Sequence, residues 1–291
     1  MGIEGIVTAL LTPFRGGEVD FTALAGLVRA QVESGVHGLV ACGTTGESAT
    51  LTEEEWAAVV RTVVGAAAGR VPVLAGTGTY STAATVHRTL AARDLGADAA
   101  LVVTPYYNRP QQEGLFRHFS AVAAEGGLPV VLYNVPGRTG VNLLPETAVR
   151  LSRVPGIAGI KEASGTVAAS REVIAGAASG FTVLSGDDAL TLPLLAIGAR
   201  GVVSVASNLA PSVMVGLWDA WQRGDSGEAA RIDRRLAPLF AALFVESSPA
   251  PAKAGAAMLG ICTDEVRLPL VAASRKTREA VDAALRMAGV L

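Results

Sequence analysis

Short apolar runs rich in β-branched residues recur along the chain at intervals of about 20 to 35 residues, with amphipathic stretches between them. This alternation is typical of βα units around a parallel sheet. Eight units close most economically into an α/β fold of the (β/α)8 TIM barrel type. An open doubly wound sheet would usually need fewer strands and a G-x-G-x-x-G turn after the first one, and TPFRGGEVD stands there instead. The eight runs are GIVTAL (5–10), GLVAC (38–42), VPVLAG (71–76), DAALVVT (98–104), PVVLYN (129–134), GIAGIK (156–161), FTVLSG (181–186) and GVVSVA (201–206).

The stretches between the runs predict helices with recognisable ends. Residues 51–68 carry the clearest start, because Thr52 stands three positions ahead of Glu55 and acidic side chains fill the first turn. After the last run, the chain is rich in Ala, Leu and Arg and predicts the eighth barrel helix with two or three extra helices. We therefore expect a barrel over residues 1–225 and a C-terminal helical extension over residues 226–291. The SSPAP segment (247–251) is too short for a linker and predicts a turn between helices.

The amino-acid composition and charge exclude several classes of protein. With 291 residues, 50% of them hydrophobic, the chain can bury a large core, so disorder is excluded. A formal charge of −2 without blocks of like charge speaks against nucleic acid as a partner. Two cysteines, Cys42 and Cys262, cannot form a multi-bridge framework and fit a reducing compartment. The start of the chain carries Glu4 instead of a basic region, and no apolar run reaches about 18 residues. We therefore expect a cytoplasmic protein that does not contact a membrane.

Lysine is rare in this chain, and Lys161 stands at a special place. Only three lysines occur, Lys161, Lys253 and Lys276, and the first of them closes the sixth apolar run. With period-two alternation, Ile157, Gly159 and Lys161 share one face, and the glycine would leave space beside the lysine stem. At the carboxyl end of a barrel strand, a free amine can attack a ketone to form a Schiff base. The alternative is a lysine that extends from the strand end to pair with Glu162.

Three of the four tyrosines also follow strand ends. Tyr106 and Tyr107 come after the fourth run, and Tyr133 lies at the end of the fifth. A phenol can pass a proton if a second hydroxyl shares the hydrogen bond, and the GTTGES loop after the second run offers Thr44 and Thr45. As alternatives, Tyr133 would be a core aromatic and Thr44 a turn cap.

A loop arginine indicates an acidic substrate. Arg138 lies in VPGRTG after the fifth run, where a guanidinium can bind a carboxylate through two parallel hydrogen bonds, or simply be a solvated arginine. The GTTGES loop lacks the GK[ST] ending of a phosphate loop. His37, His87 and His118 are dispersed without metal-ligand spacing, and no G-x-S-x-G nucleophile motif is present. We therefore expect neither a metal nor a cofactor.

Five segments together resemble the dihydrodipicolinate synthase family of pyruvate-dependent class I aldolases, which also contains N-acetylneuraminate lyase. The resemblance covers essentially the whole chain. The segments are GTTGES (43–48), TPYYNRP (104–110), YNVPGRTG (133–140), GIKEASG (159–165) and LSGDD (184–188).

The resemblance implies a lyase that condenses pyruvate with L-aspartate 4-semialdehyde, giving 4-hydroxy-tetrahydrodipicolinate for diaminopimelate and lysine biosynthesis. It gives Lys161 as the residue that forms the Schiff base. It implies that Tyr133 relays protons through Thr44 to Tyr107, the last reaching in from a neighbouring subunit of a homotetramer built as a dimer of dimers. The residues implied to bind substrate are Thr45, Arg138, Gly186 and Val205.

Departures from the family pattern leave some points open. Family members inhibited by lysine carry Asn and Glu where this chain has Tyr80 and Ala84, so we predict weak or absent feedback by lysine. The family's usual Asn before the proline of the SSPAP turn is Ser248 here, which leaves the contribution of that turn open. One rival interpretation is a Schiff-base aldolase acting on a 2-keto-3-deoxy sugar acid or on N-acetylneuraminate. Arg138 speaks against it, because the sialic acid lyases carry an apolar residue there. Another rival, from a different class, is a non-catalytic barrel that binds a keto acid.

Overall fold

Eight parallel strands form one closed barrel in the order β1-β10-β9-β8-β7-β6-β5-β4. The structure is a computed structural model that describes residues 2–291. This arrangement confirms the (β/α)8 fold class, and each strand lies within two residues of its predicted run. The barrel strands are β1 (Gly5–Ala9), β4 (Gly38–Ala41), β5 (Val73–Gly76), β6 (Ala99–Val103), β7 (Val130–Asn134), β8 (Ile157–Glu162), β9 (Thr182–Ser185) and β10 (Gly201–Ser204).

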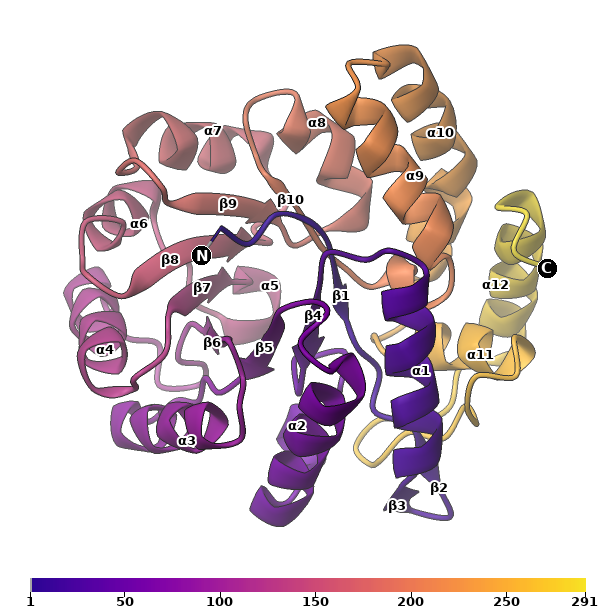
Figure 1. Cartoon of the computed structure of the whole chain (residues 1–291), viewed down its shortest axis with the longest axis horizontal. Coiled ribbons are helices and arrows are strands. Elements are labelled where there is room, and N and C mark those ends of the chain that lie inside the picture. Colours follow the sequence, from indigo (N-terminus) through magenta and orange to yellow (C-terminus); the bar gives the residue numbers. More distant parts are fainter. Residues whose placement is uncertain (1) are drawn as a thin grey trace. The chain divides into compact units, whose positions relative to one another are not determined.

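The described residues divide into two compact units. The first comprises Pro72–Val203 with residues 2–4, and in it a layer of helices lies outside the strands (Figure 1). The strand residues are almost all buried, because a parallel sheet covered by helices meets water on neither face. The helices of this unit are α3 (Thr82–Asp94), α4 (Gln112–Glu125), α5 (Pro136–Thr139), α6 (Pro145–Leu151), α7 (Val167–Gly176), the 3-10 turn η2 (Asp188–Leu190) and α8 (Thr191–Leu195).

The second unit comprises Gly5–Val71 and Ser204–Leu291, so it joins the two ends of the chain. Three helices follow α9, as the composition of this region predicts, and the SSPAP turn separates α10 from α11. The boundary predicted after residue 225 coincides with the N-cap of α10, and the domain division itself stays a prediction. The helices are α1 (Phe21–Glu33), the 3-10 turn η1 (Ser48–Thr50), α2 (Glu53–Ala67), the 3-10 turn η3 (Ala206–Asn208), α9 (Pro211–Gln222), α10 (Ser226–Ala242), α11 (Ala250–Met258) and α12 (Arg275–Met287).

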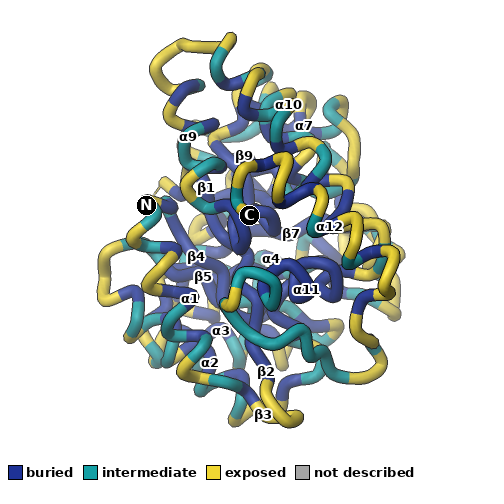
Figure 2. Tube along the Cα trace, turned by 90° about the vertical axis from the view of Figure 1, so that its right-hand side faces the viewer, coloured by how far each residue is buried: buried dark blue, intermediate teal, exposed yellow. Residues whose placement is uncertain are grey.

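Local sequence signals set the ends of two elements in this second unit. Thr52 accepts a hydrogen bond from the Glu55 backbone and Glu55 returns one to the Thr52 backbone, so the predicted capping box at α2 is confirmed. Between β1 and α1, the strands β2 (Phe14–Arg15) and β3 (Glu18–Val19) form an antiparallel hairpin that the sequence analysis missed. Its signal was the Gly16–Gly17 pair, which turns the chain with positive φ angles. Figure 2 shows the exposed tip of this hairpin.

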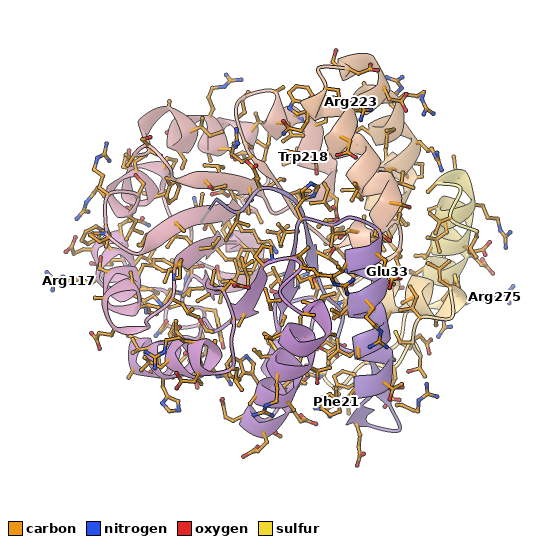
Figure 3. The ribbon with its side chains drawn as sticks, viewed as in Figure 1. Phe21, Glu33, Arg117, Trp218, Arg223 and Arg275 are labelled. Atoms are coloured by element: carbon orange, nitrogen blue, oxygen red, sulfur yellow. The ribbon has the colours of Figure 1, made fainter. Side chains whose placement is uncertain are left out.

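Many charged side chains lie on the outer surfaces of the helices. Figure 3 shows Arg117 of α4 and Arg275 of α12 pointing away from the ribbon, and each forms an ion pair four residues along its own helix. Apolar residues take the opposite faces: Trp218 of α9 is buried and packs edge-on against His37. Over residues 2–291, no helix is both long and apolar enough to cross a membrane.

Candidate active site

Lys161 is buried next to Tyr133 at the ends of two neighbouring strands. The residues are register partners of β8 and β7, and the lysine Nζ lies 4.1 Å from the centroid of the tyrosine ring. Lys161 is 5% exposed and Tyr133 6% exposed. The alternative interpretation, a lysine paired with Glu162, does not hold, because no ion pair joins Lys161 to a carboxylate within residues 2–291. A buried amine at the carboxyl end of a barrel strand is placed where it can act as a nucleophile toward a bound ketone.

Two glycines shape the space around Lys161. A Cβ on Gly186 would lie 3.2 Å from the lysine Cε and 2.6 Å from the Ala163 Cβ, so Gly186 leaves the space for the lysine stem. The prediction that Gly159 leaves this space is wrong, because a Cβ on Gly159 would instead meet the Thr182 carbonyl oxygen at 2.4 Å. Gly159 is thus required by the close approach of β9. A register shift between Val130 and Val131 also means that the predicted alternation is continuous only from Gly159 onward.

A buried polar network lies behind the lysine on the other face of β8. Glu162 accepts hydrogen bonds from the Asn134 side chain at 3.1 and 3.3 Å and from the Ser164 backbone at 2.6 Å. Burial raises the pKa of the Glu162 carboxyl, while these donors oppose the rise. Asn134 also accepts from the Leu143 backbone at 2.9 Å. The network therefore ties the ends of β7 and β8 to the loop that carries Arg138.

Arg138 and Tyr107 are exposed. Arg138 lies in α5, one short turn after β7, and its side chain reaches solvent. Tyr107 is 90% exposed and has a φ of 72°, a conformation that non-glycine residues rarely adopt. The preceding Tyr106 packs edge-on against Tyr80 with ring centroids 5.5 Å apart, and burial raises the pKa of the Tyr106 phenol. Of the two tyrosines in this loop, Tyr107 is therefore the one whose ring lies in solvent.

Thr44 and Thr45 lie in the second unit, on a tight turn after β4. The backbone N–H of Gly46 donates to the Gly43 carbonyl at 3.1 Å, and that of Glu47 donates to the Thr44 carbonyl at 3.1 Å. Thr45 is buried and Thr44 is half-buried. Gly46 has little space for a side chain, because a Cβ there would lie 3.1 Å from the Leu10 carbonyl oxygen. The turn therefore presents two hydroxyls on a backbone with little freedom.

Val205 is buried directly after β10, where the 3-10 turn η3 begins. Asn208 closes that turn by donating to the carbonyls of Val205 and Ala9 at 3.0 and 2.8 Å. Its side-chain oxygen accepts from the Leu11 backbone at 3.1 Å. Asn208 is not among the predicted site residues, and no local pattern marks it, because Ala9 and Leu11 lie near the other end of the chain.

Comparison with known proteins agrees with this geometry. The model of the Dihydrodipicolinate synthetase family matches residues 2–288. A 4-hydroxy-tetrahydrodipicolinate synthase of Magnetococcus marinus is 52% identical over 93% of each chain, and one of Syntrophus aciditrophicus is 46% identical over 99% of each chain. The crystal structure of dihydrodipicolinate synthase from Thermotoga maritima covers 100% of both chains at 43% identity, with a TM-score of 0.98. A monomeric dihydrodipicolinate synthase variant also superposes with a TM-score of 0.98 at 44% identity, over 99% of this chain and 98% of its own.

Proposed function

Because the chain belongs to the dihydrodipicolinate synthetase family, we propose that it is a lyase that condenses pyruvate with L-aspartate 4-semialdehyde to give 4-hydroxy-tetrahydrodipicolinate. The product serves diaminopimelate and lysine biosynthesis. The observation that carries the proposal is the amine of Lys161, which is buried at a strand end, free of carboxylate partners and in contact with the Tyr133 ring.

Lys161 supplies the covalent step. Its neutral amine adds to the keto carbon of pyruvate, and the loss of water gives a Schiff base. The positive nitrogen withdraws electrons, so the methyl carbon loses a proton and becomes an enamine. The enamine carbon attacks the aldehyde carbon of the second substrate and forms the new carbon–carbon bond. The amino group of that substrate then replaces the lysine nitrogen, which closes the ring and frees the enzyme.

Hydroxyl groups move the protons of these steps. We assign Tyr133, whose ring lies beside the Lys161 amine, as the phenol that exchanges a proton with the oxygen that leaves as water. We assign Thr44 as the next hydroxyl of the relay and Tyr107 as its outer end. Within the first unit, β6, β7 and β8 are parallel neighbours, so Tyr107, Tyr133 and Lys161 follow or end strands whose carboxyl ends lie on the same side of the sheet.

The remaining residues hold the substrates. Arg138 is exposed on a short loop and suits the carboxylate of aspartate semialdehyde, which a guanidinium binds through two hydrogen bonds. Thr45 and its turn are assigned to the pyruvate carboxylate. Gly186 and Val205 are assigned to the substrate site as well, and a Cβ at 186 would crowd Ala163 and the lysine stem.

A homo-oligomer is part of the proposal. Tyr107 is too exposed to act alone on its own chain, and an uncovered aromatic of this size is typical of an interface. In the second unit, Leu268 and Val271 are 79% and 69% exposed within one short apolar segment. We propose that copies of the chain cover these residues in a tetramer built from two dimers. Within residues 2–291, neither Cys42 nor Cys262 forms a disulfide, which is in keeping with a cytoplasmic enzyme.

A product assay with purified enzyme tests the function. Pyruvate and L-aspartate 4-semialdehyde should give the cyclic product by mass spectrometry, and Tyr133→Phe should slow its formation by about 10² to 10⁴-fold. The same enzyme is offered N-acetylneuraminate and a 2-keto-3-deoxy sugar acid, with cleavage to pyruvate as the readout. Turnover confined to the sugar acids would refute the synthase assignment.

A further inference from the structure

The second unit buries a pair of opposite charges that the reaction described above does not use. Lys253 of α11 and Glu47 of the turn after β4 have side chains 0% and 1% exposed, and the lysine Nζ lies 2.6 Å from the glutamate Oε1. The two residues are far apart in the sequence and neither carries substrate in the proposed mechanism. Their pairing therefore needs a reason.

The ammonium of Lys253 is held from three sides. Besides the contact with Glu47, its Nζ donates a hydrogen bond to the Glu265 carbonyl at 2.6 Å. It also lies 3.9 Å from the centroid of the Phe14 ring, within the range of a cation–π interaction. Lys253 is thus a fixed point to which the β2 strand, the segment before α12 and the turn after β4 are all attached.

Glu47 transmits this attachment to Thr44. Its φ is 53°, in the left-handed region that a non-glycine residue adopts only when its surroundings hold it. Its backbone N–H donates to the Thr44 carbonyl, and its Oε2 accepts from the Arg267 backbone at 3.0 Å. On the other side of the turn, the Thr12 hydroxyl donates to the Gly46 carbonyl at 2.7 Å. The side chain of Glu47 thus connects the Thr44 turn to Lys253 and Arg267.

Stability alone does not account for a pair of this kind. Removing two charges from water costs several kcal/mol per ion, and well-packed neutral residues in place of a buried pair are often equally or more stable. The same space could hold a glutamine and a methionine without charge. A buried pair with fixed geometry does supply direction, because each partner aligns the backbone to which it belongs.

We propose that Glu47 and Lys253 are positioning residues that hold the Thr44–Thr45 turn in its reactive geometry. The inference rests on the proposed function, in which Thr44 relays protons and Thr45 binds the pyruvate carboxylate. A displacement of about 1 Å at a reacting group can cost about 10²-fold in rate. Loss of the pair therefore lowers kcat, even where the fold survives.

The experiment compares Glu47→Gln, Lys253→Met and the double variant with the wild-type enzyme. Each single variant leaves one buried group without its partner and should lower Tm. The double variant removes both charges at nearly constant volume, so its Tm should return toward the wild-type value, while kcat should stay about 10 to 100-fold low. The exposed pair on α10 gives the matched control, because Glu228→Gln with Arg231→Met removes the same charges without touching the turn.

Recovery of both Tm and kcat in the double variant would overturn the inference, because it would show that the pair acts only through stability. If the double variant does not fold, kcat of the Glu47→Gln variant is the deciding measurement, because the glutamine can still accept a hydrogen bond from the Arg267 backbone. An unchanged kcat in that variant would equally overturn the inference. Trapping of pyruvate on wild-type Lys161 with borohydride is run in parallel, because its absence would defeat the proposed function and not the positioning role alone.

Discussion

Replacing His118 should make the free energy of unfolding less dependent on pH between pH 4 and pH 7. The imidazole lies on α4, is 5% exposed and packs edge-on against Phe119. Its Nδ1 lies 3.0 Å from the Thr82 hydroxyl, and its buried Nε2 has no hydrogen-bond partner within residues 2–291. Protonation would place a charge and an unsatisfied N–H in the protein interior. Burial accordingly lowers the pKa of His118 from 6.5 to about 4.

The size of this effect on the free energy of unfolding follows from the difference between the His118 pKa values of the folded and unfolded chains. Between pH 4 and pH 6.5 the unfolded chain binds a proton at this position that the folded chain does not bind, so the free energy of unfolding rises with pH. The difference of about 2.5 in pKa corresponds to about 3 kcal/mol, at about 1.4 kcal/mol for each unit. This contribution is fully present above pH 6.5 and is lost as the pH falls through the folded pKa of about 4.

Urea unfolding from pH 4 to pH 7.5 measures the effect. His118→Asn keeps a polar atom near the Thr82 hydroxyl but cannot titrate, so its unfolding free energy should lose about 3 kcal/mol less than that of the wild type as the pH falls. His87 of α3 is exposed, so His87→Gln is the matched control that removes an imidazole from the surface of a helix and not from the interior. Parallel profiles for His118→Asn and the wild type would refute the reasoning.

Three further predictions follow from individual contacts. Gly186→Ala should lower kcat about 10²-fold, because the new Cβ forces Ala163 or the Lys161 stem to shift, and an unchanged rate in a steady-state assay would contradict this. Thr52→Ala should reduce the unfolding free energy by about 1 kcal/mol through loss of the α2 capping box, with Glu18→Ala as an exposed control in the same urea titrations. Free lysine at millimolar concentration should leave the rate unchanged, because Ala84 offers no carboxylate to the ammonium group of lysine and the Tyr80 ring packs against Tyr106. A micromolar inhibition constant would overturn that expectation.

Local patterns were enough to predict the strands, the α2 cap and the place of Lys161. Each is encoded over a few residues: apolar runs give the strands, and Thr52 with Glu55 gives the cap. The two-residue strands of the β2–β3 hairpin were not predicted, because a pair of residues is too short to show an alternation of apolar and polar side chains.

Contacts between distant segments could not be predicted in this way. Gly159 is required by a carbonyl of the next strand, and Lys253 meets Glu47 only because the end of the chain folds back to its beginning. Nothing in the sequence around Lys253 indicates a buried partner. The chemical types of the site residues were therefore readable from the sequence, while the contacts that orient them required the structure.

Borohydride trapping with pyruvate shows whether Lys161 forms the Schiff base. The chain has three lysines, so a peptide map after reduction distinguishes them without ambiguity. We expect one reduced pyruvate per chain, on the peptide that contains Lys161, and no adduct in Lys161→Met. An unmodified wild-type chain, or an adduct on Lys253 or Lys276 instead, would contradict it.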